Sequence, residues 1–180
     1  NATSVMAVGA AIDRAEIDGL MQAVAANPNC AIGLHATLTA PFAPLTMHFK
    51  PLDGGQFLPL GRLLRTSLLR RLDPEIVHAE LLAQIAAFRQ LFGRAPDYID
   101  GHQHTQLFPQ IRDAGKKAYE AAPNADPQLT RFLVKMAMDD AMNDHYRTAL
   151  DLADLLIKNE ADEKQIYVAG GIAAFGLDDY

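Results

Sequence analysis

The sequence has a single cysteine, Cys30, and no excess of positive charge. One cysteine can neither close a disulfide within the chain nor build a thiolate zinc site, so we expect a reducing, cytoplasmic compartment. Sixteen Lys and Arg residues face 22 Asp and Glu residues, a net charge of −6 that lacks the basic field needed to neutralise phosphates. No apolar run approaches the ~20 residues of a membrane span. We therefore expect a soluble protein with neither nucleic acid nor membrane as a partner.

Three motifs of common enzyme classes are also missing: the nucleophile elbow Gly-x-Ser-x-Gly, the dinucleotide fingerprint Gly-x-Gly-x-x-Gly and the phosphate-binding loop. What is present is a chain of 180 residues, 49% of them hydrophobic, which is long enough to bury a sizeable core. Residues 115–180 hold 7 basic and 12 acidic side chains, whereas residues 1–114 are near balance. We therefore predict two units, residues 1–121 and residues 122–180.

Short apolar runs alternate with amphipathic segments over the first unit. The pattern predicts the following elements: strands at residues 5–8, 30–38 and 98–99, and helices at residues 13–27, 60–72, 74–92 and from 109 onward. Strands that alternate with helices are typical of a parallel α/β fold. Functional side chains in such folds lie where the strands end.

Histidines stand next to two of these predicted strand ends. His35 ends the segment Ile32-Gly33-Leu34-His35, and His102 and His104 follow Asp100. Neutral imidazole is the commonest metal ligand, so two strand ends together can supply two histidines to one ion. Asp100 is placed to orient one imidazole through its second nitrogen. The alternative is that these histidines are ordinary hydrogen-bonded structural residues.

Four motifs then occur in a fixed order: Thr3-Ser4-Val5-Met6, Ile32-Gly33-Leu34-His35 with Leu38-Thr39, Leu91-Phe92-Gly93-Arg94-Ala95-Pro96, and Asp100-Gly101-His102-Gln103-His104 with Phe108-Pro109. In order and spacing they resemble the YdjC-like carbohydrate deacetylases, the group that contains the chitooligosaccharide deacetylases, over residues 1 to about 114. The resemblance implies a partial (β/α)-barrel-like fold. It also implies that a divalent metal, Mg or Zn, helps to remove acetyl groups from N-acetylated sugars.

The resemblance assigns roles to individual residues. His35 and His102 match the metal ligands of the family, and His104 matches a second histidine that lines the site. In the family an Asp-Asp-Phe-Gly motif supplies the third ligand and the base, and residues 1–180 contain no such sequence. We therefore expect a central piece of a deacetylase with two of its three ligands, in which His104 and Asp100 are the catalytic candidates. Asp100 is the first candidate for the missing carboxylate.

The acidic second unit has a regularity of its own. Tyr146 and Tyr180 are 34 residues apart, which is the period of a tetratricopeptide repeat. The apolar stripe of Leu152, Leu155 and Leu156 predicts a helix, and we expect antiparallel helices over residues 130–180 with turns near 126–129 and 159–164. The alternative is that these are ordinary amphipathic helices of the first unit.

Three functions follow from these patterns. The first is a metal-dependent deacetylase, whole or as a fragment, which acts on N-acetylated sugars or oligosaccharides. The second is a protein-interaction module, in which the helical segment 122–180 binds a peptide or protein and the α/β unit is inactive. The third is a structural domain without activity. The content of bound metal distinguishes the first function from the other two.

Overall fold

The computed structural model describes residues 2–9, 13–27, 30–114, 142 and 146–158. Its elements in chain order are β1 (Ala2–Val5), α1 (Arg14–Ala26), β2 (Ala31–Ala36), α2 (Leu60–Leu68), α3 (Pro74–Phe92), β3 (Ile99–Gly101), the 3₁₀ segment η1 (His102–Leu107) and α6 (Tyr146–Lys158). The chain divides into two compact units, Asn1–Ile111 and Arg112–Tyr180. Within the ranges just given, none of the helices combines the length and apolar character needed to cross a bilayer.

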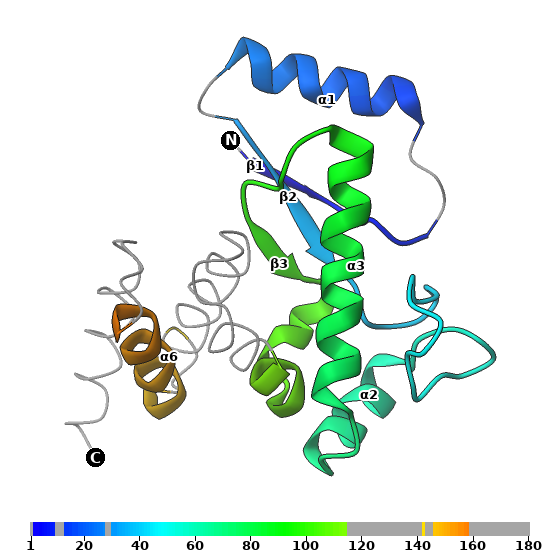
Figure 1. The fold of residues 1–180 in the computed structure, drawn as a ribbon, viewed down its shortest axis with the longest axis vertical. Helices are drawn as coiled ribbons and strands as arrows, with labels where there is room; N and C mark the ends of the chain where they lie inside the picture. The colour runs from blue at the N-terminus through cyan, green and yellow to red at the C-terminus, as the bar shows by residue number, and fades with distance from the viewer. Residues whose placement is uncertain (1, 10–12, 28–29, 115–141, 143–145, 159–180) are drawn as a thin grey trace. The chain divides into compact units, whose positions relative to one another are not determined.

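The three strands form one parallel sheet in the order β1-β2-β3 (Figure 1). Each strand is followed by helical structure, so the parallel α/β class predicted from the sequence is confirmed, although the sheet is small. α3 packs against β2 on one side of the sheet, and α1 packs against both α3 and β2. The side chains that β2 and β3 turn to this side are buried, namely Ile32, Leu34, Ala36 and Ile99.

Local signals account for the ends of the two long helices. α1 begins with a capping box, in which the Asp13 side chain accepts from the Ala15 N–H and Glu16 accepts from the Asp13 N–H. α3 begins after Asp73, whose carboxylate accepts from the Glu75 N–H, and ends at Gly93 with φ of 66°. A left-handed residue ends a helix best when it is glycine, because it has no Cβ to clash. Both helices therefore lie where the sequence predicts them.

Three predicted elements differ from the structure. The first strand is at Ala2–Val5 and not at residues 5–8, because it pairs with β2 through the polar Thr3 and Ser4. Val8 is buried but lies outside the strand. The apolar run at residues 5–8 therefore indicated buried side chains and not a strand. α2 ends at Leu68, four residues earlier than predicted. The third strand is Ile99–Gly101, which begins and ends later than residues 98–99.

α6 is the part of the second unit that the structure describes as an element. Leu152 and Leu156 are buried and Asp151 and Asp154 are exposed, so the predicted apolar stripe is confirmed there. The predicted turns near 126–129 and 159–164, and the position of Tyr180, lie outside the described residues. The predicted boundary between residues 121 and 122 lies outside them as well.

Candidate metal centre at the parallel sheet

The pairing register places polar side chains on one face of the sheet. Ser4 is opposite Gly33, and His35 is opposite Asp100. Because side chains alternate between the two faces of a strand, Gly33 and His35 share a face with Ser4 and Asp100. This face lies opposite the apolar one on which α3 packs. Each of the three strands thus contributes one polar side chain to the same site.

His35 and Asp100 form the shortest contact of the site. His35 Nδ1 lies 2.8 Å from Asp100 Oδ1, and each side chain is 25% exposed. An ionised carboxylate can only accept hydrogen bonds, so His35 must donate through Nδ1–H. In its neutral form His35 then carries its lone pair on Nε2, which points away from Asp100. The pair therefore presents one defined nitrogen, His35 Nε2, whose lone pair can bind a metal ion.

His102 meets that nitrogen. His35 Nε2 lies 3.1 Å from His102 Nδ1, and the two rings stand edge to face with centroids 5.1 Å apart. The pKa of His102 is lowered by burial and, to a smaller extent, by the nearby His35 ring. A lowered pKa favours the neutral imidazole, which is the form that binds a metal. The sequence-based expectation that His35 and His102 approach each other agrees with this geometry, whereas their role as ligands stays a prediction.

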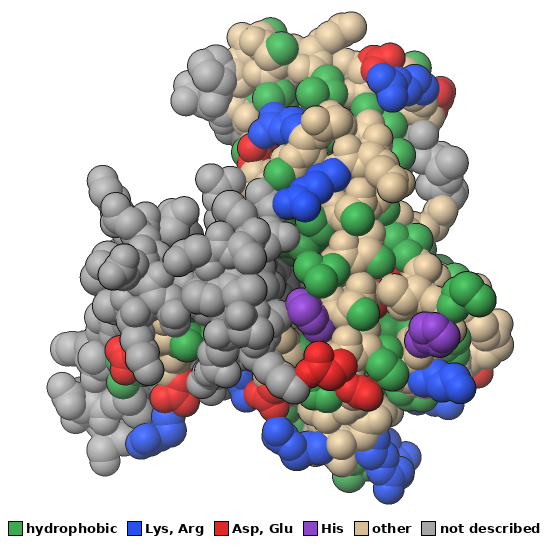
Figure 2. Space-filling view, viewed as in Figure 1, with side chains coloured by type: hydrophobic (Ala, Val, Ile, Leu, Met, Phe, Trp, Pro, Cys, Tyr) green, Lys and Arg blue, Asp and Glu red, His purple; other side chains and the backbone are tan. Residues whose placement is uncertain are grey.

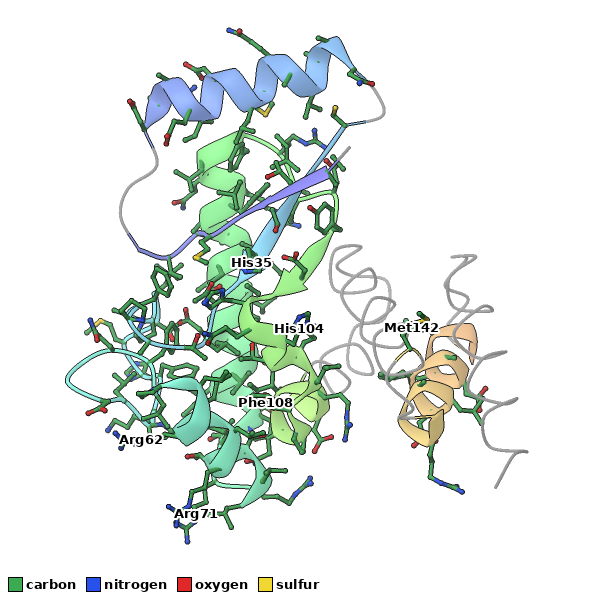
Figure 3. All side chains as sticks on the ribbon, turned by 180° about the vertical axis from the view of Figure 1, so that it is seen from behind. His35, Arg62, Arg71, His104, Phe108 and Met142 are labelled. Carbon is green, nitrogen blue, oxygen red and sulfur yellow. The ribbon has the colours of Figure 1, made fainter. Side chains whose placement is uncertain are left out.

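His104 does not join this pair. It lies just beyond the tip of β3, in η1, and is exposed (Figure 3). Gln103 and His104 both have φ of 55°, a left-handed conformation that residues other than glycine rarely adopt. These two residues reverse the chain directly after His102. Hence the spacing of two residues between His102 and His104 does not aim both imidazoles at one point.

A buried carboxylate that the sequence did not reveal holds the loop beside the site. Glu80 on α3 accepts hydrogen bonds from the Leu45 and Thr46 N–H groups at 3.0 and 2.9 Å, and from the Thr46 hydroxyl at 2.6 Å. Gln84, one turn further along α3, bonds both the N–H and the carbonyl of Thr37. The sequence signal that could have revealed this pair was the presence of two polar residues, four positions apart, on an otherwise apolar helix face.

The same loop brings an aromatic ring to the histidines. Phe42 stands edge to face with His102, with centroids 6.0 Å apart. Its backbone carbonyl accepts from the Phe57 N–H at 2.8 Å, which fixes the loop on the side of His102. Phe42 therefore forms a half-buried apolar wall next to the two nitrogens.

The donor set fits a divalent ion through two nitrogens. His35 Nε2 and His102 Nδ1 are close enough to bind one ion at the ~2.0–2.1 Å typical of zinc and imidazole. Asp100 on the far nitrogen of His35 is the usual outer partner of a ligating histidine. Among the residues that the structure describes, no cluster of three or more His, Cys, Asp or Glu side chains completes the coordination.

Comparison with known proteins gives a family match over nearly the whole chain. Residues 1–175 match the model of a family described as YdjC-like protein. A carbohydrate deacetylase of Homo sapiens is 34% identical over 93 residues, and a chitooligosaccharide deacetylase of Serratia marcescens is 39% identical over 90 residues. The family match extends past residue 114, where the motifs end, and includes the segment in which we expected tetratricopeptide-like helices.

The matched regions are limited in length. The human relative is matched over 49% of this chain and 29% of its own length, and the Serratia relative over 47% and 32%. The matched part of the chain thus spans about a third of these relatives. A solved structure of a candidate cellobiose-phosphate cleavage protein from Enterococcus faecalis V583 superposes with a TM-score of 0.49 at 22% identity, over 67% of this chain and 44% of that chain.

Proposed function

The chain belongs to the YdjC-like protein family, and from this premise we propose that it carries metal-binding residues of a divalent-metal amide hydrolase that removes acetyl groups from N-acetylated sugars. The names of the human and Serratia relatives support the reaction and the class of substrate. The observation that carries the proposal is the 3.1 Å separation of His35 Nε2 and His102 Nδ1.

His35 and His102 would hold the ion, which would be Mg or Zn. Once bound, the ion would supply Lewis-acid polarisation of the acetyl carbonyl. The protein's own contribution is a pair of neighbouring imidazole nitrogens. His35 Nε2 accepts from His102 Nδ1–H at 3.1 Å, and an ion bound between the two nitrogens would take the place of that proton. Asp100 fixes the proton of His35 on Nδ1, and the lowered pKa of His102 favours its neutral form.

Of the two roles that the sequence offers Asp100, orienting an imidazole and acting as the base, we propose the first. Its Oδ1 is occupied by His35 and its Oδ2 accepts from the Ser4 hydroxyl at 3.1 Å. Both oxygens therefore have donors, which makes Asp100 a positioning residue and not a free base for the attacking water. The base, by family resemblance, belongs to an Asp-Asp-Phe-Gly motif that residues 1–180 do not contain.

We assign His104 to the leaving group. The amide nitrogen must gain a proton before the sugar amine departs, and an exposed imidazole after β3 is suited to donate it. The Phe42 ring beside His102 would pack against apolar parts of the substrate, such as the acetyl methyl group.

The test measures acetate release from N-acetylglucosamine oligomers with added zinc or magnesium. We expect His35→Ala and His102→Ala each to abolish whatever release residues 1–180 support, because each removes a ligand. His104→Ala should lower kcat by about 100-fold without preventing metal binding, as is typical for loss of a general acid. His48→Ala, on the exposed part of the loop, is the matched control and should change neither quantity.

Acetate release that is metal-independent, or that survives both His35→Ala and His102→Ala, would contradict the proposal. So would zinc binding that is equally strong in those variants and in the wild-type chain.

A further inference from the structure

A hydroxyl on β1 lies behind the carboxylate that orients His35. Ser4 Oγ is 3.1 Å from Asp100 Oδ2 and 3.5 Å from His35 Nδ1. The shorter contact is with the carboxylate, which is 2.8 Å from His35 through its other oxygen. Asp100 is therefore held from two sides, by a residue of β1 and a residue of β2, while it stands on β3.

The directions of these hydrogen bonds follow from the chemistry of the groups. The Asp100 carboxylate only accepts, so both the Ser4 hydroxyl and the His35 ring must donate to it. The hydroxyl of Ser4 has one proton, which is thereby committed to Asp100. The Tyr98 phenol is a further neighbour of this hydroxyl. The result is a hydrogen-bonded chain from Ser4 to Asp100, which His35 joins from the other side.

The sheet makes this chain rigid. Ser4 is opposite Gly33, and the Tyr98 ring lies over Gly33, where an added Cβ would come within 2.4 Å of the ring. The strands fix the spacing of Ser4, His35 and Asp100, since each residue stands on a different strand of one hydrogen-bonded sheet. A serine hydroxyl at this position therefore meets the carboxylate without any rearrangement of the backbone.

From this arrangement we propose that Ser4 is a positioning residue, whose hydroxyl locks the rotation of the Asp100 carboxylate and thereby keeps the proton of His35 on Nδ1. Without Ser4, Asp100 Oδ2 loses the one hydrogen-bond donor that it has among the described residues, and the carboxylate is free to turn away from His35. The imidazole then exchanges between its two tautomers. In the tautomer protonated at Nε2, the nitrogen that faces His102 has no lone pair to offer to a metal. The consequence for metal binding rests on the proposed function, whereas the tautomer itself does not.

The experiment compares four chains: wild type, Ser4→Ala, Ser4→Thr and Thr3→Ala. The state of His35 is read by nitrogen-15 NMR of the imidazole at about pH 8 in the metal-free protein, and zinc affinity by calorimetry. We expect Nδ1–H to predominate in the wild type and in Ser4→Thr, which keeps the hydroxyl. Ser4→Ala should give a mixture of tautomers and weaken zinc binding by about 10-fold, the lower end of the range for lost outer partners. Thr3→Ala, at the exposed neighbouring position, should match the wild type in both.

Ser4→Cys serves as a second variant, because it is nearly the same size but donates weakly, and it should behave as Ser4→Ala does. A His35 spectrum and a zinc affinity that are unchanged in both Ser4→Ala and Ser4→Cys would overturn the proposal. If the His35 tautomer shifts in Ser4→Ala but the wild-type chain binds no zinc, the positioning role of Ser4 is supported and the metal site is overturned. Zinc affinity that falls in Ser4→Ala without any change of tautomer would overturn the positioning role and leave the metal site standing.

Discussion

Gly33 is the residue whose lack of a side chain makes room for the outer layer of the site. A Cβ at this position would lie 2.4 to 2.7 Å from three atoms of the Tyr98 ring, well inside van der Waals contact. We predict that Gly33→Ala lowers the free energy of unfolding by about 1–3 kcal/mol, as overpacking of a well-packed region does. Urea denaturation of the wild type and of Gly33→Ala measures this difference in the free energy of unfolding.

Gly19 is the matched control for this prediction. It lies within α1 with nothing within 4 Å of an added Cβ. Gly19→Ala should therefore raise the free energy of unfolding by about 0.5–1 kcal/mol, because alanine loses less backbone entropy in a helix. If Gly33→Ala were as harmless as Gly19→Ala, the Tyr98 ring would not lie where the structure places it.

Tyr98 gives a prediction about pH. Burial and the charges of Asp100 and Asp97 raise its pKa above the usual 10.0, and the hydrogen bond with Ser4 lowers it by less. In the unfolded chain the phenol ionises near pH 10, while in the folded chain it stays neutral to higher pH. The stability that Tyr98 contributes is thus complete below pH 10 and is lost as the pH rises through its folded pKa. The free energy of unfolding should fall more steeply above pH 10 in the wild type than in Tyr98→Phe, and equal slopes would rule this out.

At the scale of elements, α3 does more than cover the sheet. Glu80 and Gln84 are both fully buried, and their hydrogen bonds tie the loop after β2 to the middle of the helix. We predict that Glu80→Ala lowers the free energy of unfolding by about 2–3 kcal/mol, because the buried Gln84 amide and three half-buried donors of Leu45 and Thr46 lose their acceptor at once. Gln90→Ala, at an exposed position of the same helix, should change it by less than about 0.5 kcal/mol. Equal effects of the two substitutions would show that the Glu80 contacts contribute nothing.

The helices could be predicted from sequence because their signals are local. Asp13 with Glu16, and Asp73 with Pro74 and Gly93, mark helix ends whatever the rest of the chain does. The strands were placed less well, since β1 holds the polar residues Thr3 and Ser4 and is defined by pairing with β2. A strand that is defined by pairing with residues 29 or more positions away cannot be located from its own few residues alone.

The site shows the same division between local and distant contacts. His35 and His102 could be predicted from their places at strand ends, whereas the part of Ser4 could not, because its contact with Asp100 joins residues 96 positions apart. The spacing of two residues between His102 and His104 also could not predict where His104 lies. Two consecutive left-handed residues turn the chain away from the direction that an extended segment would give.

At the scale of the whole molecule, charges of both signs are interspersed on the face shown in Figure 2, with histidine side chains among them. The net charge of −6 and the acidic bias of residues 115–180 predict weak electrostatic attraction to polyanions such as nucleic acid. The family match to residue 175 was not predictable from motifs, because the second unit has helical periodicity that many proteins share.

Counting ligands gives a prediction for the whole chain. Two imidazoles bind a divalent ion less tightly than the three ligands of a typical catalytic site. We predict that residues 1–180 bind zinc weakly and release acetate slowly, and that joining a segment with an Asp-Asp-Phe-Gly motif ahead of β1 strengthens both. His35→Ala in the joined chain should reverse the gain. Rapid turnover by residues 1–180 alone would show instead that a carboxylate of this chain already acts as the base.

X-ray absorption at the zinc edge tests most directly the central claim, that His35 and His102 hold one ion between them. With protein in excess over zinc, the wild-type chain should show two imidazole nitrogens at about 2.0–2.1 Å. His35→Ala and His102→Ala should each lose one of the two. A wild-type spectrum with oxygen neighbours alone, or one that neither substitution changes, would contradict the account.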